Sequence, residues 1–306
     1  MKKIAAIVVT FNRLTTLRVV ISKLQNQTFP LSEIIIVNNG STDGTQEWLS
    51  SKKEQLTIIN QQNTGGSGGF YSGIKYALES SQNHNYVWLM DDDGHPDDSA
   101  LEELIPHLKT KSTVLNSLVL DILKTGDLVF SAFSFKHQSE LKNAPTIQGM
   151  LFPFNGTLIP LSLVKRIGLP IPEMFIWGDE SEYYFRMKNV IGNDMYIIPS
   201  SIFYHPKNNG RFYQKNWSLL KDWQVYFFVR NKQIVYLTKY RNNKFMAVFH
   251  YLVFILALLA YTVCFSRSNF LKKLILYKTA ISHSFEKQLA WKATDVKKYI
   301  NNLLLS

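Results

Sequence analysis

Short apolar runs alternate with amphipathic segments along the first hundred residues, and this alternation restricts the fold more than any other feature. The apolar runs, which we expect to be buried strands, are residues 4–9, 33–37, 56–60 and 86–90. Apolar residues recur at helical spacing after the first run. Repeated strand–helix units of this kind predict an α/β fold with a mostly parallel sheet flanked by helices.

Each predicted strand is followed by a polar segment, and these segments are residues 10–13, 38–41, 63–69 and 91–94. Ligands of parallel sheets bind beyond the carboxyl ends of the strands. The four segments therefore mark the expected binding edge of the sheet.

Three consecutive carboxylates, Asp91, Asp92 and Asp93, follow the fourth predicted strand. They repel one another unless a cation or a bound partner relieves the repulsion. Alternation along an extended segment places Asp91 and Asp93 on one side and Asp92 on the other, and paired carboxylates suit Mg²⁺ or Mn²⁺. The alternative is an acidic loop that caps the next helix. We favour metal binding because the triplet lies at a strand end.

Four glycines within residues 65–69 lie between the third predicted strand and a helix expected from about Phe70. Glycine lets backbone N–H groups approach a ligand, and a helix N-terminus attracts anions. The spacing matches neither the dinucleotide pattern nor the P-loop. A flexible turn explains the glycines as well as a cradle does, but the nearby aspartates favour a cradle for a diphosphate or an acceptor.

A second acidic cluster, Asp179, Glu180 and Glu182, opens a predicted helix after Trp177. Carboxylates at a helix start interact favourably with the helix dipole, which is a structural explanation. The catalytic explanation is that one of them is a general base. His205, which precedes a proline, is equally compatible with a structural role and with a ligand role.

The net charge of +11 comes from the C-terminal third, because residues 201–306 hold 17 Lys and Arg against 3 Asp and Glu. Such a region can face nucleic acid or anionic lipid. It contains an uncharged apolar stretch, residues 245–265, of about the length that a membrane-spanning helix needs. Tyrosine, histidine and threonine interrupt this stretch. We therefore favour a helix in the membrane interface over a span or a buried core helix.

Two features bear on the compartment. Cys264 is the single cysteine, which excludes an intrachain disulfide and a cysteine-based zinc site. The apolar run at residues 4–9 is too short for a secretion signal, so we expect a cytoplasmic protein.

Four motifs occur in the order found in family 2 glycosyltransferases of the GT-A fold: residues 7–13 (IVVTFNR), 36–45 (IVNNGSTDGT), the aspartate triplet and 177–180 (WGDE). The chain resembles this family over about residues 1–205. Residues 63–70 (NTGGSGGF) resemble the galactofuranosyltransferase branch in particular. Rhamnosyltransferases of bacterial polysaccharide synthesis are similar neighbours. The resemblance implies a GT-A, Rossmann-like fold.

The resemblance also implies roles for individual residues. The residues implied at a Mn²⁺ or Mg²⁺ ion are Asp91, Asp93 and His205. The residues implied at the nucleotide-sugar donor are Thr10, Arg13, Asn38, Gly65, Gly66, Asp91 and Asp92. The residues implied at the acceptor are Trp177, Gly68 and Gly69. Glu180 is the implied general base, with Asp179 as its close alternative.

The resemblance implies an inverting, metal-dependent glycosyltransferase that moves galactofuranose from UDP-galactofuranose onto a glycan or lipid-linked acceptor in cell-surface polysaccharide synthesis. A dTDP-rhamnose rhamnosyltransferase of the same fold is the alternative. A basic nucleic-acid-binding protein would explain the charge, but it leaves both acidic clusters unexplained. A nucleotidyltransferase would need a glycine-rich basic loop where residues 10–13 stand.

We predict a glycosyltransferase domain at residues 1–210, with a nucleotide-sugar half at 1–110 and an acceptor half at 111–210. Residues 211–306 are predicted to form a basic, apolar helical region that associates with the membrane. The expected partners are the nucleotide sugar, the saccharide acceptor and the anionic inner face of the cell membrane, without nucleic acid. A homo-oligomer is compatible with the sequence.

Overall fold

The computed structural model describes residues 2–124, 126–130, 135–141, 144–148, 154–207, 221–265, 270–286 and 289–303. The chain divides into two compact units. The sheet unit contains Met1–Pro172 and Arg186–Lys207, and the helical unit contains Glu173–Phe185 and Asn208–Ser306. Segment 173–185, which carries the second acidic cluster, thus belongs with the C-terminal helices. The domain boundary predicted after residue 210 lies outside the described residues.

The sheet unit is built on a nine-stranded sheet. Its strands are β1 (Ile4–Thr10), β2 (Glu33–Asn38), β3 (Thr57–Asn60), β4 (Tyr86–Asp91), β5 (His95–Pro96), β6 (Val114–Asp121), β7 (Ile147–Gln148), β8 (Asn155–Pro160) and β9 (Met195–His205). Their order is β3-β2-β1-β4-β8-β6-β9-β5, and β7 pairs with β9. The first four strands are parallel, as the strand–helix alternation predicts. The other half is mixed, because β8 runs antiparallel to β4 while β6 and β9 are parallel.

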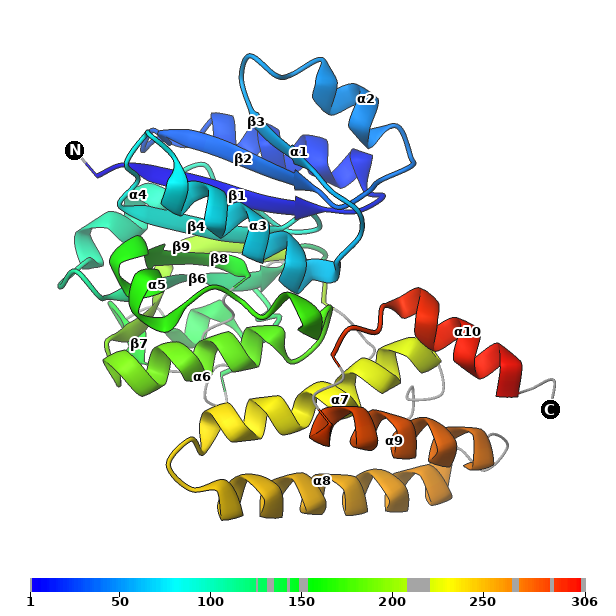
Figure 1. Ribbon diagram of the computed structural model, residues 1–306. Helices are drawn as coiled ribbons and strands as arrows, with labels where there is room; N and C mark the ends of the chain where they lie inside the picture. The colour runs from blue at the N-terminus through cyan, green and yellow to red at the C-terminus, as the bar shows by residue number, and fades with distance from the viewer. Residues whose placement is uncertain are drawn as a thin grey trace. The chain divides into compact units, whose positions relative to one another are not determined.

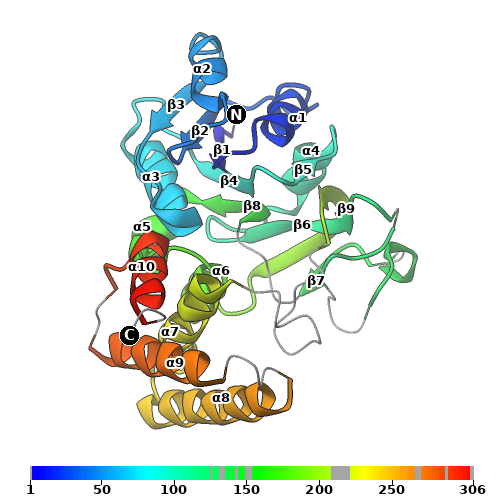
Figure 2. The same ribbon diagram turned by 90° about the vertical axis from the view of Figure 1, so that its right-hand side faces the viewer.

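Helices cover both faces of this sheet, as Figures 1 and 2 show. On one face α1 (Leu14–Gln25) and α4 (Ala100–Leu104) bury Leu17 and Leu101 in a core shared with Trp88. On the opposite face α3 (Gly65–Glu79) lies across β1, β2 and β4. The other helices that lie wholly or partly in the sheet unit are α2 (Thr45–Ser50), α5 (Leu161–Ile167) and α6 (Asp179–Ile191). Short 3₁₀ turns occur at Ile105–His107, Gln138–Leu141 and Pro172–Met174.

The glycine-rich segment is helical, so the loop predicted there is wrong. Helix α3 begins at Gly65, and its first turns contain the glycines. A Cβ on Gly69 would lie 2.3 Å from Cγ1 of Val9, and one on Gly73 would lie 2.5 Å from Cγ2 of Ile7. The missing side chains let α3 lie close on β1. This packing offsets the cost of glycine within a helix.

The described helices of the helical unit are α7 (Asp222–Lys239), α8 (Lys244–Phe265), α9 (Phe270–Phe285) and α10 (Ala293–Leu303), together with the start of α6. Helices α7, α8 and α9 lie side by side and share an aromatic core that includes Phe227, Tyr251 and Tyr277. The Tyr251 hydroxyl donates to the Val229 carbonyl at 3.1 Å, and the Tyr277 hydroxyl lies 2.9 Å from that of Thr262. These bonds satisfy the tyrosine hydroxyls inside the core.

Helix α8 is apolar on both its buried and its exposed side. Tyr251 and Leu258 are fully buried, whereas Phe245 and Leu256 are 77% and 66% exposed. Lys244–Cys264 is long and apolar enough to cross a membrane, by length and composition only. We call its exposed residues the apolar side of α8, and they include Phe245, Phe249, Leu252, Val253, Leu256 and Val263.

Candidate active site

The aspartate triplet begins where β4 ends, next to the end of the parallel strand β1. Asp91 is the last residue of β4, and Asp92 lies in the turn that follows. The buried Asp92 carboxylate accepts hydrogen bonds from Thr10 Oγ1 at 2.8 Å and from Phe11 N at 3.1 Å. Nη1 of Arg13 lies 3.0 Å from Asp92 Oδ1. Burial raises the pKa of Asp92 more than these donors lower it.

Arg13 contacts both Asp92 and Asp93, so the predicted placement of these two carboxylates on opposite sides is wrong. The strand ends at Asp91, and the turn directs Asp93 Oδ2 to within 2.5 Å of Arg13 Nη1. Asp93 Oδ1 lies 3.2 Å from His205 Nε2. Burial acts to raise the pKa of Asp93, but the contact with His205 and the charge of Arg13 outweigh it. The pKa of Asp93 is therefore below its ordinary value.

Strand pairing brings His205 to the triplet. β5 follows the triplet directly and pairs with the end of β9, where His95 is in register with Tyr204. The connection passes so close to β9 that a Cβ on Gly94 would lie 2.9 Å from the Tyr204 carbonyl oxygen. Glycine at position 94 therefore allows Asp93 to reach His205, and no motif in the sequence singles it out.

The pair of Asp93 and His205 fits a divalent cation. His205 Nδ1 lies 2.7 Å from the Pro206 carbonyl oxygen, which can only accept, so Nδ1 carries a proton. In a neutral ring, Nε2 then directs its lone pair at Asp93 Oδ1, a buried atom without a hydrogen-bond partner in the described part of the chain. This arrangement is repulsive unless the ring is protonated or a cation binds both groups.

The third predicted metal ligand, Asp91, is not gathered with this pair. Across the residues that the structure describes, no three histidine, cysteine or acidic side chains form a group that could hold a metal ion. The structure thus brings together Asp93 and His205, and Asp91 stays a prediction. Phosphate and water oxygens usually complete the shell of a hard cation at such sites.

Amide side chains after β2 hold the start of α3. Asn38 Nδ2 donates to Asn60 Oδ1 at 2.9 Å, and Asn38 Oδ1 accepts from Ser41 N at 3.1 Å. Asn39 Nδ2 donates to the Gly65 carbonyl at 2.8 Å. Asn38 thus uses both amide atoms within the fold, and its contact with a donor stays a prediction. Asn39 lies in the motif at residues 36–45 but has no role predicted from the sequence. In the structure its side chain links the end of β2 to the start of α3.

The four glycines predicted at the substrates lie in the first turns of α3. Gly68 and Gly69 are buried, and side chains there would meet Thr64 and Val9. Gly65 and Gly66 stand at the helix N-terminus, where N–H groups point along the axis and favour an anion. The structure gives Gly68 and Gly69 a packing role, and Gly65 bonds to Asn39 and Asn63. The contacts of all four glycines with donor and acceptor stay predictions.

The second acidic cluster lies in the helical unit at the start of α6. Asp179 and Glu182 are buried, and Glu182 Oε1 accepts a hydrogen bond from Thr238 Oγ1 at 3.1 Å. Burial, together with the charges of Glu180 and Glu182, raises the pKa of Asp179 to about 7. A carboxyl group that titrates near neutral pH suits a general base. Asp179 thus has the environment that this role requires.

Trp177 lies in a turn that α7 holds in place. Its φ angle is 61°, a value that is uncommon for bulky residues. Asn231 of α7 donates to the Trp177 carbonyl oxygen at 2.8 Å. Trp177 stays the predicted acceptor contact. Asn231 and its neighbour Arg230 carry no sequence motif, and only their burial and contacts identify them.

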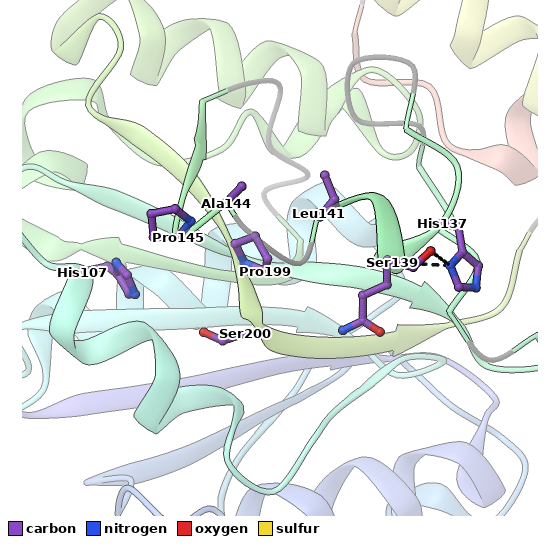
Figure 3. Close-up of a pocket in the computed structure, with 9 residues that line it drawn as sticks. His107, His137, Ser139, Leu141, Ala144, Pro145, Pro199 and Ser200 are labelled. Carbon is purple, nitrogen blue, oxygen red and sulfur yellow. Dashed lines mark hydrogen bonds between the residues drawn. The ribbon is translucent and has the colours of Figure 1, made fainter.

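A hollow of about 700 Å³ in the sheet unit is lined by residues other than these. Figure 3 shows His107 and Pro199 among its lining residues, with His137 Nδ1 joined to the Ser139 hydroxyl at 2.7 Å. None of the lining residues is a predicted site residue. The hollow therefore gives no support to the candidate site, and we assign it no ligand.

Residues 5–151 match the protein family described as Glycosyl transferase family 2. The chain is 30% identical over 198 residues to the galactofuranosyltransferase GlfT1 of Mycobacterium tuberculosis (strain CDC 1551 / Oshkosh), which covers 61% of this chain and 64% of that protein. It is 26% identical over 197 residues to GlfT1 of Mycolicibacterium smegmatis. That alignment covers 60% of this chain and 65% of that protein. The alignments thus span slightly less than two thirds of the length of these relatives.

A solved structure supports the fold along almost the whole chain. The crystal structure of S. aureus TarS 1-349 matches with a TM-score of 0.58 at 15% identity, covering 97% of this chain and 89% of that one. A likeness at this identity supports the fold alone. The predicted GT-A-like architecture, with a central sheet flanked by helices, is confirmed.

Proposed function

Because residues 5–151 match glycosyl transferase family 2, we propose that this chain transfers a sugar from a nucleotide sugar to a saccharide acceptor and inverts the anomeric carbon. The proposed donor is UDP-galactofuranose, since the curated relatives are named galactofuranosyltransferases. The proposed acceptor is a glycan or lipid-linked saccharide of cell-surface polysaccharide synthesis.

The observation that carries this proposal is the contact of Asp93 Oδ1 with His205 Nε2 at the binding edge of a family 2 sheet. Asp93 and His205 would hold Mn²⁺ or Mg²⁺, with Asp91 as a further ligand. When bound, the ion supplies positive charge that stabilises the leaving nucleoside diphosphate. Asp92 orients Thr10 and Arg13 through its hydrogen bonds. The Arg13 side chain is 48% exposed and would contact the donor phosphates.

The base is proposed to come from the start of α6. Glu180 is the base that the sequence resemblance implies, but the raised pKa of about 7 favours Asp179 as the group that accepts the proton. The acceptor hydroxyl loses its proton to Asp179 as its oxygen attacks the anomeric carbon. The bond from that carbon to the diphosphate oxygen breaks on the opposite face. Glu180 would raise the basicity of Asp179 through its charge.

A donor screen with the full chain tests the function. Purified protein would receive UDP-galactofuranose, dTDP-rhamnose, UDP-galactose or UDP-glucose with a lipid-linked saccharide acceptor and Mn²⁺. We expect nucleoside diphosphate release and a new glycosidic bond, detected by NMR, with UDP-galactofuranose. Turnover of dTDP-rhamnose alone would select the alternative donor. Absence of transfer with every donor, together with salt-dependent DNA or RNA binding in a gel shift, would contradict the proposal.

Membrane attachment at the inner face of the cell membrane is proposed for the helical unit. The apolar side of α8 exposes Phe245 and Leu256, whereas the opposite side packs into the helical unit. The exposed Arg241 precedes this helix, and the exposed Lys244 is its first residue. An in-plane helix with one apolar side and nearby basic residues fits an anionic lipid surface. Because Tyr251 and Leu258 are buried on the other side, we favour this arrangement over a span.

Vesicle flotation tests the attachment. The full chain should float with phosphatidylglycerol vesicles and less with neutral phosphatidylcholine vesicles. Replacing Phe245 and Leu256 by serine should reduce flotation, because it removes exposed apolar area that would otherwise enter the lipid. Ile122→Ser is the control, since Ile122 is an exposed apolar residue of the sheet unit. Equal flotation of all three proteins would contradict attachment through α8.

A further inference from the structure

A turn with unusual backbone geometry precedes the second acidic cluster in the helical unit. Phe175, Trp177 and Gly178 have φ angles of 64°, 61° and 95°. Glycine adopts such angles freely, but a bulky aromatic residue adopts them only when its surroundings enforce them. Ile176 N donates to the Met174 carbonyl at 2.7 Å, which closes a three-residue turn around Phe175. The turn therefore needs external contacts to persist.

One asparagine of α7 supplies these contacts. The fully buried Asn231 directs Nδ2 at three carbonyl oxygens, those of Met174 at 2.8 Å, Ile176 at 3.0 Å and Trp177 at 2.8 Å. Carbonyl oxygens only accept, so the amide nitrogen must be the atom that faces the turn. Each of these carbonyls belongs to a left-handed residue or to the residue before one. The asparagine side chain thus binds the turn at both of its strained positions.

Arg230 orients that asparagine. Its side chain is fully buried, and its Nε donates to Asn231 Oδ1 at 3.0 Å, which fixes the direction of the amide. Nη2 donates to the Glu173 carbonyl at 2.5 Å, and the guanidinium carbon lies 4.7 Å from the Phe227 ring centre. Among the described residues no carboxylate forms an ion pair with Arg230. Carbonyl dipoles and an aromatic ring are weak compensation for a buried charge, so stability alone is a poor reason for this arginine.

The chain stays against α7 beyond the turn. A Cβ on Gly178 would lie 3.2 Å from Asn231 Cβ and 3.3 Å from Val235 Cγ2. Thr238 Oγ1 donates to Glu182 Oε1 at 3.1 Å. Residues 231, 235 and 238 are spaced by four and three positions, so they share one face of α7. This single helix face contacts both the strained turn and the acidic cluster that follows it.

We propose that Arg230 and Asn231 are positioning residues for sugar transfer, which force the left-handed turn and so set the direction in which α6 presents Asp179 and Glu180. The inference rests on the proposed function in that it takes these carboxylates as the source of the base. It gives the C-terminal helical unit a part in catalysis in addition to membrane attachment. A misplaced catalytic group lowers the rate by about 10²-fold even when it is still present.

The test replaces Asn231 by aspartate, which keeps the shape and gives Arg230 a partner but removes the donors to the three carbonyls. We expect Asn231→Asp to lower kcat about 10- to 100-fold, with the KM for UDP-galactofuranose within about twofold. Amide hydrogen exchange within residues 173–182 should become about tenfold faster. A protein that only lost stability would exchange faster throughout the helical unit instead.

Tyr251→Phe is the matched control, because it also removes a buried hydrogen bond to α7, at the Val229 carbonyl. Its hydroxyl bonds neither the turn nor the acidic cluster. The control should leave kcat and the exchange of residues 173–182 close to those of the unchanged protein. Equal acceleration in Tyr251→Phe and Asn231→Asp would overturn the inference, since the effect would then be general to α7. Should Asn231→Asp fail to fold, Asn231→Ser, which keeps one hydroxyl donor, is judged by the same exchange criterion.

The outcomes separate this inference from the proposed function. Unchanged kcat in Asn231→Asp, in a protein whose Asp179→Asn variant is inactive, overturns the positioning role and leaves the proposed function intact. Full turnover in both Asp179→Asn and Glu180→Gln overturns the proposed base and, with it, the catalytic part of the inference. Unchanged exchange in residues 173–182 of Asn231→Asp overturns the structural part in either case.

Discussion

The two acidic clusters carry similar side chains in opposite electrostatic environments. In the sheet unit, contact with His205 and the charge of Arg13 hold the pKa of the half-buried Asp93 below its ordinary value. In the helical unit, burial and the neighbouring carboxylates act in the same direction and raise the pKa of Asp179 to about 7. Asp93 is therefore ionised at neutral pH, as a cation site requires, whereas Asp179 can exchange a proton.

The difference shows that a run of acids does not define its own chemistry. Both clusters bury carboxylates, and both follow a buried apolar segment. What separates them is the sign of the charges that the fold brings near. An arginine and a histidine distant in sequence reach the first cluster, while acids of the same helical turn surround Asp179.

Removing the proton acceptor should have the largest effect. Asp179→Asn should lower kcat by about 10² to 10⁴, the usual contribution of a general base, while donor binding measured by calorimetry stays near normal. Asp295→Asn is the control, because Asp295 is a carboxylate at the start of another helix of the same unit and accepts from Lys292 N at 2.7 Å. Equal losses of kcat in both variants would show that Asp179 only stabilises the start of α6.

Removing the His205 imidazole should weaken metal binding, which we assign to the first acidic cluster and not to the second. His205→Ala should weaken Mn²⁺ binding at least about tenfold, because it takes one ligand from the proposed site. Electron paramagnetic resonance of free Mn²⁺ measures this directly. His95→Ala is the control, since His95 lies on β5, the strand paired with β9, and its Nδ1 lies 3.3 Å from the Pro96 carbonyl oxygen. Unchanged Mn²⁺ affinity in His205→Ala would remove His205 from the site.

The pH dependence of turnover sharpens the comparison further. If Asp179 is the base, kcat should rise with pH through about 7. Glu180→Gln removes a negative charge that raises this pKa, so the rise should move to lower pH. Stability changes in the opposite direction: neutral Asp179 favours the folded state, and this contribution, complete below about pH 4, is lost as pH increases through about 7. A pH profile that does not move in Glu180→Gln, or complete loss of transfer in it, would count against Asp179.

The smallest effect is expected from the backbone that joins the triplet to β9. Gly94→Ala should lower the free energy of unfolding by about 1–3 kcal/mol, because the added methyl group would press on the Tyr204 carbonyl. Denaturant unfolding measures the change. Asp98→Ala is the reference, since it removes only an exposed pair with Lys23 and should cost about 0–1 kcal/mol. A Gly94→Ala change no larger than this reference would mean that the turn can relax.

Local patterns predicted much of the sheet unit. The four apolar runs are parallel strands in the structure, as predicted. Strands of a parallel sheet are buried on both faces, so their sequences are continuous apolar runs. The polar residues after β1 and β4 meet at one edge, as the parallel order requires. The glycine-rich segment was misjudged because propensity disfavours glycine in helices. Only the approach of α3 to Val9 and Ile7 explains why Gly69 and Gly73 stand in one.

The helical unit was far less predictable. The length of the apolar stretch indicated α8, but nothing in the sequence pattern joined residues 173–185 to helices that begin only at Asp222. Arg230 and Asn231 read as ordinary polar residues of a basic region. Their burial and their bonds to the Met174 carbonyl became apparent only once the chain was folded.

The sequence by itself determined the strand–helix order, the resemblance to a glycosyltransferase family and the positions of the acids, because these depend on periodicity and on neighbouring residues. Tertiary structure alone decided which cations reach Asp93, why Asp179 holds its proton to about pH 7, and how Asn231 holds the turn before it. The physical reason is that pKa values and backbone strain depend on groups brought close in space, and contacts over long sequence separations leave no local pattern.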